Sequence, residues 1–200
     1  MTRRIDDLLD QIAGLERELE HELNRAQAEF RYRVHAGRVH FAREVRALHR
    51  RARQSVPRFL RESSLLNLLT APFIYSTIVP IGLLDLWVTA YQIVCFRAYG
   101  IARVRRSRYI VIDRQHLAYL NAIEKVNCVY CGYANGVFAY VREITGRTEQ
   151  YWCPIRHAKR VQAPHTHYRH FVDYGDADAY RRRLTVLRHE LRDEPHTHQH

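Results

Sequence analysis

The chain has 200 residues, room for one domain of ordinary size or two small ones, and 46% of them are hydrophobic. Its formal net charge is +11, and 30 of its 32 basic residues are arginine. This charge predicts a partner that carries phosphate, on lipid or on nucleic acid, although a GC-rich genome would explain the ratio of Arg to Lys. The sequence contains none of the motifs GxxxxGK[ST], GxSxG and HExxH, so the enzyme classes built on those motifs are excluded.

Residues 1–62 have the pattern of an amphipathic helix. Proline is absent from residues 4–55, and apolar side chains recur every three or four positions at Ile5, Leu8, Ile12, Leu15 and Leu19. We therefore expect a long helix that is acidic at its start and basic in its second half. Its first part, residues 5–23, is a candidate coiled coil for self-association, and packing on its own chain is the alternative.

The next segment, residues 63–98, is predicted to be embedded in a membrane. Asp85 is the one charged residue in positions 65–96. Arginines flank the segment on both sides, at Arg50, Arg51, Arg53, Arg58 and Arg61 before it and at Arg97, Arg103, Arg105, Arg106 and Arg108 after it. Positive flanks stay on the cytoplasmic side, so the bulk of the chain is expected there. The same arginines are candidate ligands for anionic lipids or, as a weaker alternative, for nucleic acid.

The length of the apolar stretch bears on how it would enter the bilayer. Thirty-two residues of helix would span about 48 Å, against a hydrocarbon core of about 30 Å. We predict a hairpin that turns near Pro80 and Gly82, because both arginine-rich flanks then remain on one side. A single crossing and a buried helical hairpin of a soluble protein are the alternatives.

Residues 99–163 contain the spacing of a four-ligand metal site. Cys128 and Cys131 form a CxxC pair, and Cys153 and His157 follow as a CxxxH pair. Glycine at position 132 suits the turn of a zinc knuckle, and a helix over 137–150 would connect the two half-sites. We predict structural zinc in a Cys3His site, with an iron–sulfur cluster on the same ligands or metal-free cysteines as alternatives. Clustered thiols indicate a reducing compartment.

Residues 164–200 are predicted to form a basic helix followed by a tail that contains histidines. The fold class expected for the whole chain is mainly α. The expected function is a membrane-associated, cytoplasm-facing zinc protein with a non-catalytic adaptor or assembly role and an unknown protein partner. A soluble zinc protein that binds nucleic acid and a metal-handling or iron–sulfur protein are the alternatives.

Overall fold

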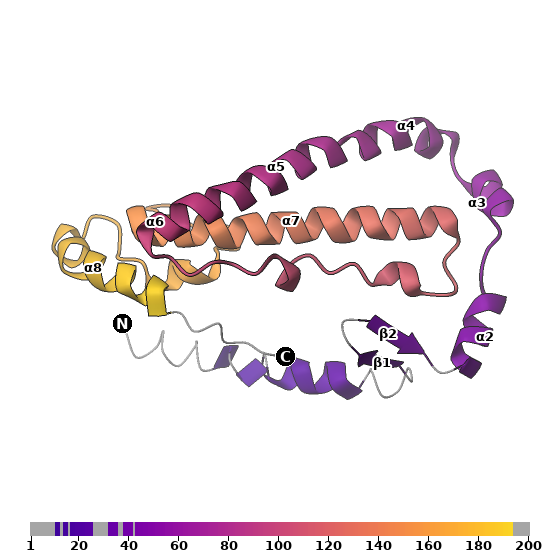
Figure 1. Ribbon diagram of the computed structural model, residues 1–200, viewed down its shortest axis with the longest axis horizontal. Coiled ribbons are helices and arrows are strands. Elements are labelled where there is room, and N and C mark those ends of the chain that lie inside the picture. Colours follow the sequence, from indigo (N-terminus) through magenta and orange to yellow (C-terminus); the bar gives the residue numbers. More distant parts are fainter. Residues whose placement is uncertain are drawn as a thin grey trace. The chain divides into compact units, whose positions relative to one another are not determined.

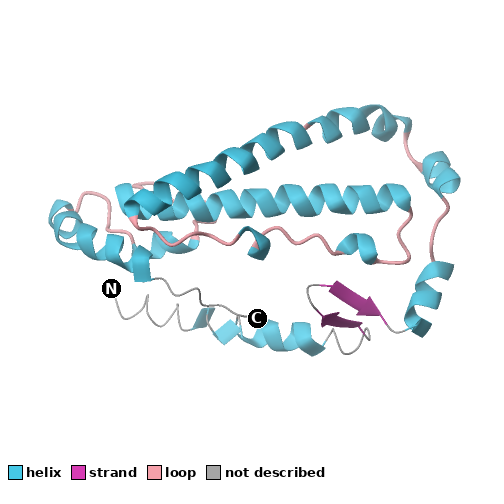
Figure 2. Ribbon diagram, in the orientation of Figure 1, coloured by secondary structure: helices cyan, strands magenta, loops and turns pink. Residues whose placement is uncertain are grey.

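The structure is a computed structural model that describes residues 11–12, 14–15, 17–25, 32–35, 38–41 and 43–193. The predicted seam positions Ile5 and Leu8 and the tail 194–200 lie outside the described residues. The described part is mainly helical, as predicted (Figure 2). It divides into two compact units, Met1–Glu62 with Asp113–Val126, and Ser63–Ile112 with Asn127–His200.

The first unit differs from the single long helix that the sequence predicted. Residues 17–25 are helical, but a two-stranded antiparallel hairpin follows, with β1 (Tyr32–His35) paired to β2 (Arg38–Phe41). Both strands alternate an aromatic or β-branched residue with a polar one, which is the two-residue period of a strand. This short alternation outweighs the helical spacing that runs through the same positions.

Two helices follow the hairpin, α2 (Arg43–Arg51) and α3 (Val56–Glu62). Pro57 is the second residue of α3, where its missing N–H would have had no partner within the helix. After a 3₁₀ turn at Arg114–His116, Asn121 caps the next helix. The Asn121 Oδ1 atom accepts from the backbone N–H of Glu124 at 3.0 Å, and Glu124 Oε2 accepts from the Asn121 N–H at 2.7 Å.

The apolar stretch forms one helical run from Leu65 to Tyr99 in the second unit (Figure 1). The run consists of α4 (Leu65–Ser76), α5 (Ile78–Tyr91), a π-helical turn (Gln92–Phe96) and α6 (Arg97–Tyr99). The predicted turn near Pro80 is wrong, because Pro80 lies in the first turn of α5, where proline is tolerated. Gly100, at φ +70°, ends the run in the left-handed conformation.

A long helix, α7 (Ala122–Trp152), lies beside the Leu65–Tyr99 run and points in the same direction, and the two separate towards α4 (Figure 1). Thr77 bonds Tyr130 near one end of the pair, and Tyr91 Oη lies 3.0 Å from Thr148 Oγ1 near the other. After the run ends, residues 101–112 lead back along α7 in the opposite direction; they are called the return segment (Figure 1). A Cβ on Gly136 of α7 would lie 2.7 Å from the Cα atom of Ile110, so only glycine allows the return segment to approach so closely.

The C-terminal part of the chain packs on the end of α7. It comprises a 3₁₀ helix (Thr166–His170) and α8 (Ala177–Asp193). Leu187 and Leu191 of α8 are fully buried, and Leu191 joins the main core of the second unit. The other buried members of that core are Phe96, Ile101, Val104, Tyr140 and Ile144.

Candidate functional site

The four predicted metal ligands do not converge. Cys128 and Cys131 lie inside α7, whereas Cys153 follows its last residue. Twenty-two residues of helix separate Cys131 from Cys153, which is about 33 Å at 1.5 Å per residue. Zinc needs all four ligand atoms within about 2.3 Å of the ion. The described residues contain no group of three His, Cys, Asp or Glu side chains placed to hold a metal.

The physical reason is the length of α7. The sequence predicted a turn at Cys128–Gly132 followed by a helix over 137–150, but α7 is continuous from Ala122 to Trp152, so Gly132 lies within a helix and makes no turn. All four cysteines are free thiols, and burial together with nearby Glu149 raises the pKa of Cys153. The His157 ring stacks on Tyr168, with centroids 6.2 Å apart. The structure therefore does not support the zinc-knuckle module, and an iron–sulfur cluster would need the same convergence.

The arginines proposed as lipid or nucleic-acid ligands fall into two groups, one in each unit. Arg50, Arg51, Arg53, Arg58 and Arg61 belong to the first unit, in or between α2 and α3. Arg97, Arg103, Arg105, Arg106 and Arg108 belong to the second unit and are all exposed; these five are called the arginine rim. The rim extends from the end of the helical run into the return segment.

Asp85, the one acid of the apolar stretch, is 7% exposed and is neutralised within the fold. It accepts from Arg106 Nη2 at 2.6 Å and from Arg106 Nε at 3.1 Å, and Tyr133 Oη of α7 donates to it at 2.9 Å. A buried carboxylate needs such partners because an unpaired charge would be costly to desolvate. This ion pair joins the helical run, the return segment and α7.

Gln92 makes a second polar junction one and a half to two turns further along the run. Its Oε1 atom accepts from the backbone N–H of Val104 at 3.0 Å, and its amide nitrogen donates to the Tyr140 hydroxyl. Gln92 is 2% exposed and Tyr140 is fully buried. The polar side chains of the run that make these contacts thus point towards α7 and the return segment.

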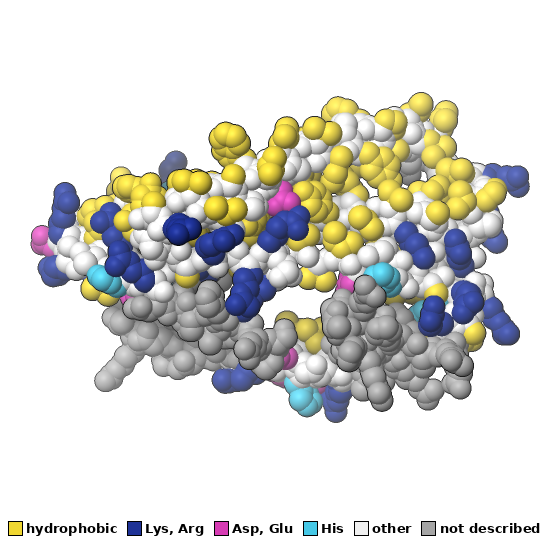
Figure 3. Space-filling view, viewed as in Figure 1, with side chains coloured by type: hydrophobic (Ala, Val, Ile, Leu, Met, Phe, Trp, Pro, Cys, Tyr) yellow, Lys and Arg dark blue, Asp and Glu magenta, His cyan; other side chains and the backbone are white. Residues whose placement is uncertain are grey.

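The opposite side of the run is apolar and open. Nine of its side chains are each more than 60% exposed, and they are called the outer face: Leu65, Leu66, Leu69, Phe73, Val79, Leu83, Leu86, Trp87 and Val94. At 100° of rotation per residue these positions fall on one side of the helix. Figure 3 shows hydrophobic side chains gathered along one edge. Monomeric soluble proteins rarely expose so large an apolar patch, so this surface is the candidate functional site.

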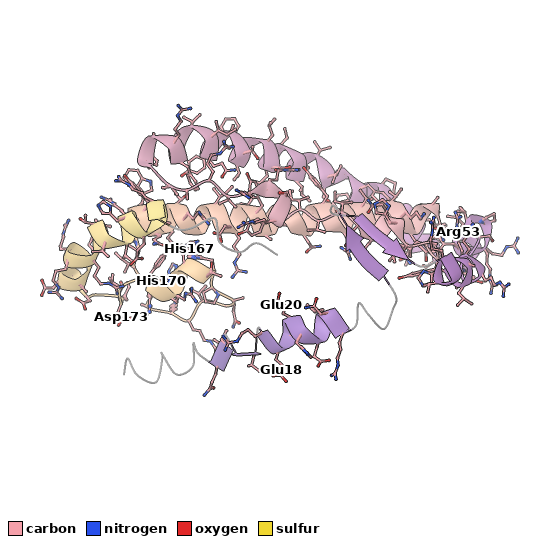
Figure 4. All side chains as sticks on the ribbon, turned by 60° about the horizontal axis from the view of Figure 1, so that its bottom comes forward. Glu18, Glu20, Arg53, His167, His170 and Asp173 are labelled. Atoms are coloured by element: carbon pink, nitrogen blue, oxygen red, sulfur yellow. The ribbon has the colours of Figure 1, made fainter. Side chains whose placement is uncertain are left out.

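A buried polar cluster fixes the C-terminal part of the chain to α7. His167, labelled in Figure 4, lies with its Nε2 atom 3.0 Å from Glu143 Oε1 and its Nδ1 atom 2.8 Å from Gln150 Oε1. Gln150 Nε2 donates to the Leu187 carbonyl at 3.0 Å, which turns its oxygen towards the imidazole. Both ring nitrogens of His167 thus lie within hydrogen-bonding distance of a side-chain oxygen.

The carboxylate of Glu143 is held strongly in its ionised form. Burial alone would raise its pKa, but the hydrogen bond and charge of His167, together with Arg147, lower the pKa to about 2. Arg147 Nη2 lies 2.8 Å from Glu143 Oε1, and Arg147 Nη1 donates to the Ala102 carbonyl at 2.9 Å. The cluster therefore connects α7 to the return segment through Arg147 and to the 3₁₀ helix through His167.

Comparisons with known proteins give no relative: no protein family, no curated protein and no solved structure matches this chain.

Sequence reasoning missed both buried charge clusters. Asp85 was noted as the one acid of its segment, but its partner Arg106 is 21 residues away in a segment of no regular structure. Glu143, Arg147 and Gln150 recur at spacings of four and three on α7, and this helical spacing of charged and amide residues was the available signal.

Proposed function

We propose that this protein is a non-catalytic adaptor that attaches to the cytoplasmic side of a membrane through the Leu65–Tyr99 run. The observation that carries the proposal is the outer face. The run is long and apolar enough to cross a bilayer, and only 17% of its most apolar 18-residue window is buried. The core helix of a soluble protein would be covered on most sides, whereas this one leaves nine large apolar side chains open.

Two observations support the cytoplasmic side. All four cysteines are free thiols, which suits a reducing compartment. The arginine rim follows the apolar run directly, and arginines next to a membrane segment are retained on the cytoplasmic side. The first unit would serve the adaptor role, because Ile12, Leu15, Leu19 and Leu23 are each more than half exposed and recur at helical spacing. That stripe is proposed to bind a protein partner or a second copy of the chain.

A flotation experiment tests the membrane attachment. The purified full chain is mixed with vesicles of phosphatidylcholine and phosphatidylserine and centrifuged through a density gradient. We expect the wild-type protein to float with the vesicles and Leu83→Glu to float much less. Leu48→Glu in α2 is the matched control, because Leu48 and Leu83 are both 63% exposed. Wild-type protein that stays at the bottom of the gradient and binds an RNA homopolymer would instead favour the nucleic-acid function.

A further inference from the structure

We propose that the Leu65–Tyr99 run lies in the plane of an anionic bilayer and does not cross it. The outer face enters the boundary between headgroups and acyl chains, and the rim arginines other than Arg106, which is paired with Asp85, bind the lipid phosphates. This inference rests on the proposed membrane attachment and specifies its geometry. It differs from both membrane arrangements that the sequence suggested, the hairpin and the single crossing.

The inner side of the run is already occupied by protein. Ile81 packs with Ala134 and Val137 of α7, and Phe96 is fully buried in the main core. Asp85 and Gln92 are likewise bound to α7 and the return segment. A helix that is covered along one side and apolar along the other resembles an interfacial helix more than one surrounded by lipid.

The return segment is the decisive obstacle to a crossing. Arg106 is bonded to Asp85, and Val104 is bonded to Gln92, so the arginines around them lie beside the middle and the C-terminal half of the run. Every 20-residue window of residues 65–96 except the first contains Asp85. A crossing that used any of these windows would carry Arg106 and its neighbours into the hydrocarbon, or would break the contacts of the return segment with Asp85 and Gln92.

The first window, residues 65–84, avoids that conflict but leaves another. It would keep Leu86, Trp87 and Val94 outside the hydrocarbon, although these are 69%, 79% and 68% exposed. An in-plane helix places all nine outer-face side chains in the acyl boundary at once. Burial of about 5 to 10 Å is the depth at which such helices rest.

Charge points to an anionic surface as the occupant. Residues 63–112 contain the five rim arginines and one acid, Asp85. All five arginines are exposed, and Figure 3 shows basic side chains beside the apolar edge. Phosphate-bearing headgroups next to an apolar layer match this arrangement. A second copy of the chain docked face to face would instead bring two arginine rims together, and like charges at an interface oppose association.

Labelling before and after the run distinguishes the two geometries. Cysteine is introduced by Ser64→Cys before α4 or by Ser107→Cys in the return segment, both exposed positions outside the outer face. Vesicle-bound protein is treated with a membrane-impermeant maleimide, and labelling of each introduced cysteine is read by peptide mass spectrometry relative to detergent-solubilised protein. The in-plane geometry predicts labelling of both positions to the same extent as in detergent. A loss of half or more at either position indicates a crossing and overturns the inference while leaving membrane attachment intact.

Removing rim arginines tests the role of the headgroups. Each arginine near an anionic surface contributes about fivefold in affinity, so Arg103→Gln with Arg105→Gln should weaken binding to phosphatidylserine-containing vesicles about 25-fold. The matched control is Arg182→Gln with Arg183→Gln on the exposed side of α8, which should leave affinity within about twofold. Equal losses in the two pairs would contradict the rim assignment. Failure of wild-type protein to bind any vesicle would refute the proposed membrane attachment itself.

Discussion

Glu143→Gln is expected to destabilise the second unit through the cluster around His167. The Glu143 side chain is 13% exposed, and it faces Arg147 and His167, whose side chains are 14% and 6% exposed. The neutral amide removes the counter-charge of Arg147 and the carboxylate oxygen beside His167 Nε2 in a largely dry site, which is costlier than losing an exposed ion pair.

The magnitude follows from the pKa of Glu143, which is lowered from 4.5 to about 2. At 1.36 kcal/mol per pKa unit the ionised form gains roughly 3 kcal/mol on folding. Solvent that reaches the exposed part of the side chain reduces this gain, so we expect Glu143→Gln to lower the free energy of unfolding by about 2 kcal/mol at pH 7.

The pH dependence has a definite sign. The folded pKa lies below the unfolded value, so this contribution is complete above about pH 5 and is lost as the pH falls from there towards 2. Denaturant unfolding in mild detergent, followed by circular dichroism between pH 7 and pH 3, should show the wild-type stability declining through this window. The variant should follow a flatter curve, with Glu190→Gln on the exposed surface of α8 as the control. Parallel curves for wild type and Glu143→Gln would refute the reasoning.

Three further substitutions test the packing and the cysteines. Gly136→Ala should lower the free energy of unfolding by about 1 to 3 kcal/mol, because the added Cβ would lie 2.7 Å from Ile110 Cα. Gly14→Ala is the control: a Cβ there would meet no atom within 4 Å, so the free energy of unfolding should stay the same or rise slightly. Leu187→Ala should cost about 2 to 5 kcal/mol, as its side chain is fully buried, and a loss below 1 kcal/mol would mean that α8 is not docked. Cys128→Ser should shift the melting temperature by no more than a few degrees and leave the metal content unchanged, because the structure places no group of metal ligands at this thiol. If the variant instead lost both its fold and a bound zinc ion, the predicted zinc site would be supported.

The apolar periodicity of the chain was enough to predict a mainly helical fold, but not where its helices begin. Pro80 was read as the centre of a turn, yet proline is tolerated in the first turn of a helix, and α5 begins two residues before it. The hairpin of β1 and β2 was not predicted, because a four-residue strand provides only two repeats of its two-residue period.

The candidate site was predicted in part. The apolar run is visible in the sequence alone, and all nine outer-face side chains belong to it. The cysteine spacing predicted a knuckle turn where α7 is helical, because residues i and i+3 meet both in a knuckle turn and on one face of a helix. The continuity of α7 from Ala122 to Trp152 decides between these.

The depth of Trp87 in the bilayer tests the central claim most directly. Trp87 is 79% exposed on the outer face, and Trp152→Phe leaves it as the single tryptophan of the chain. Its fluorescence is measured on phosphatidylcholine–phosphatidylserine vesicles that carry bromine at different acyl positions. In-plane attachment predicts the strongest quenching by bromines close to the headgroups. Quenching that is strongest at the bilayer centre would contradict the in-plane geometry, and no quenching by any of the lipids would contradict membrane attachment through the outer face.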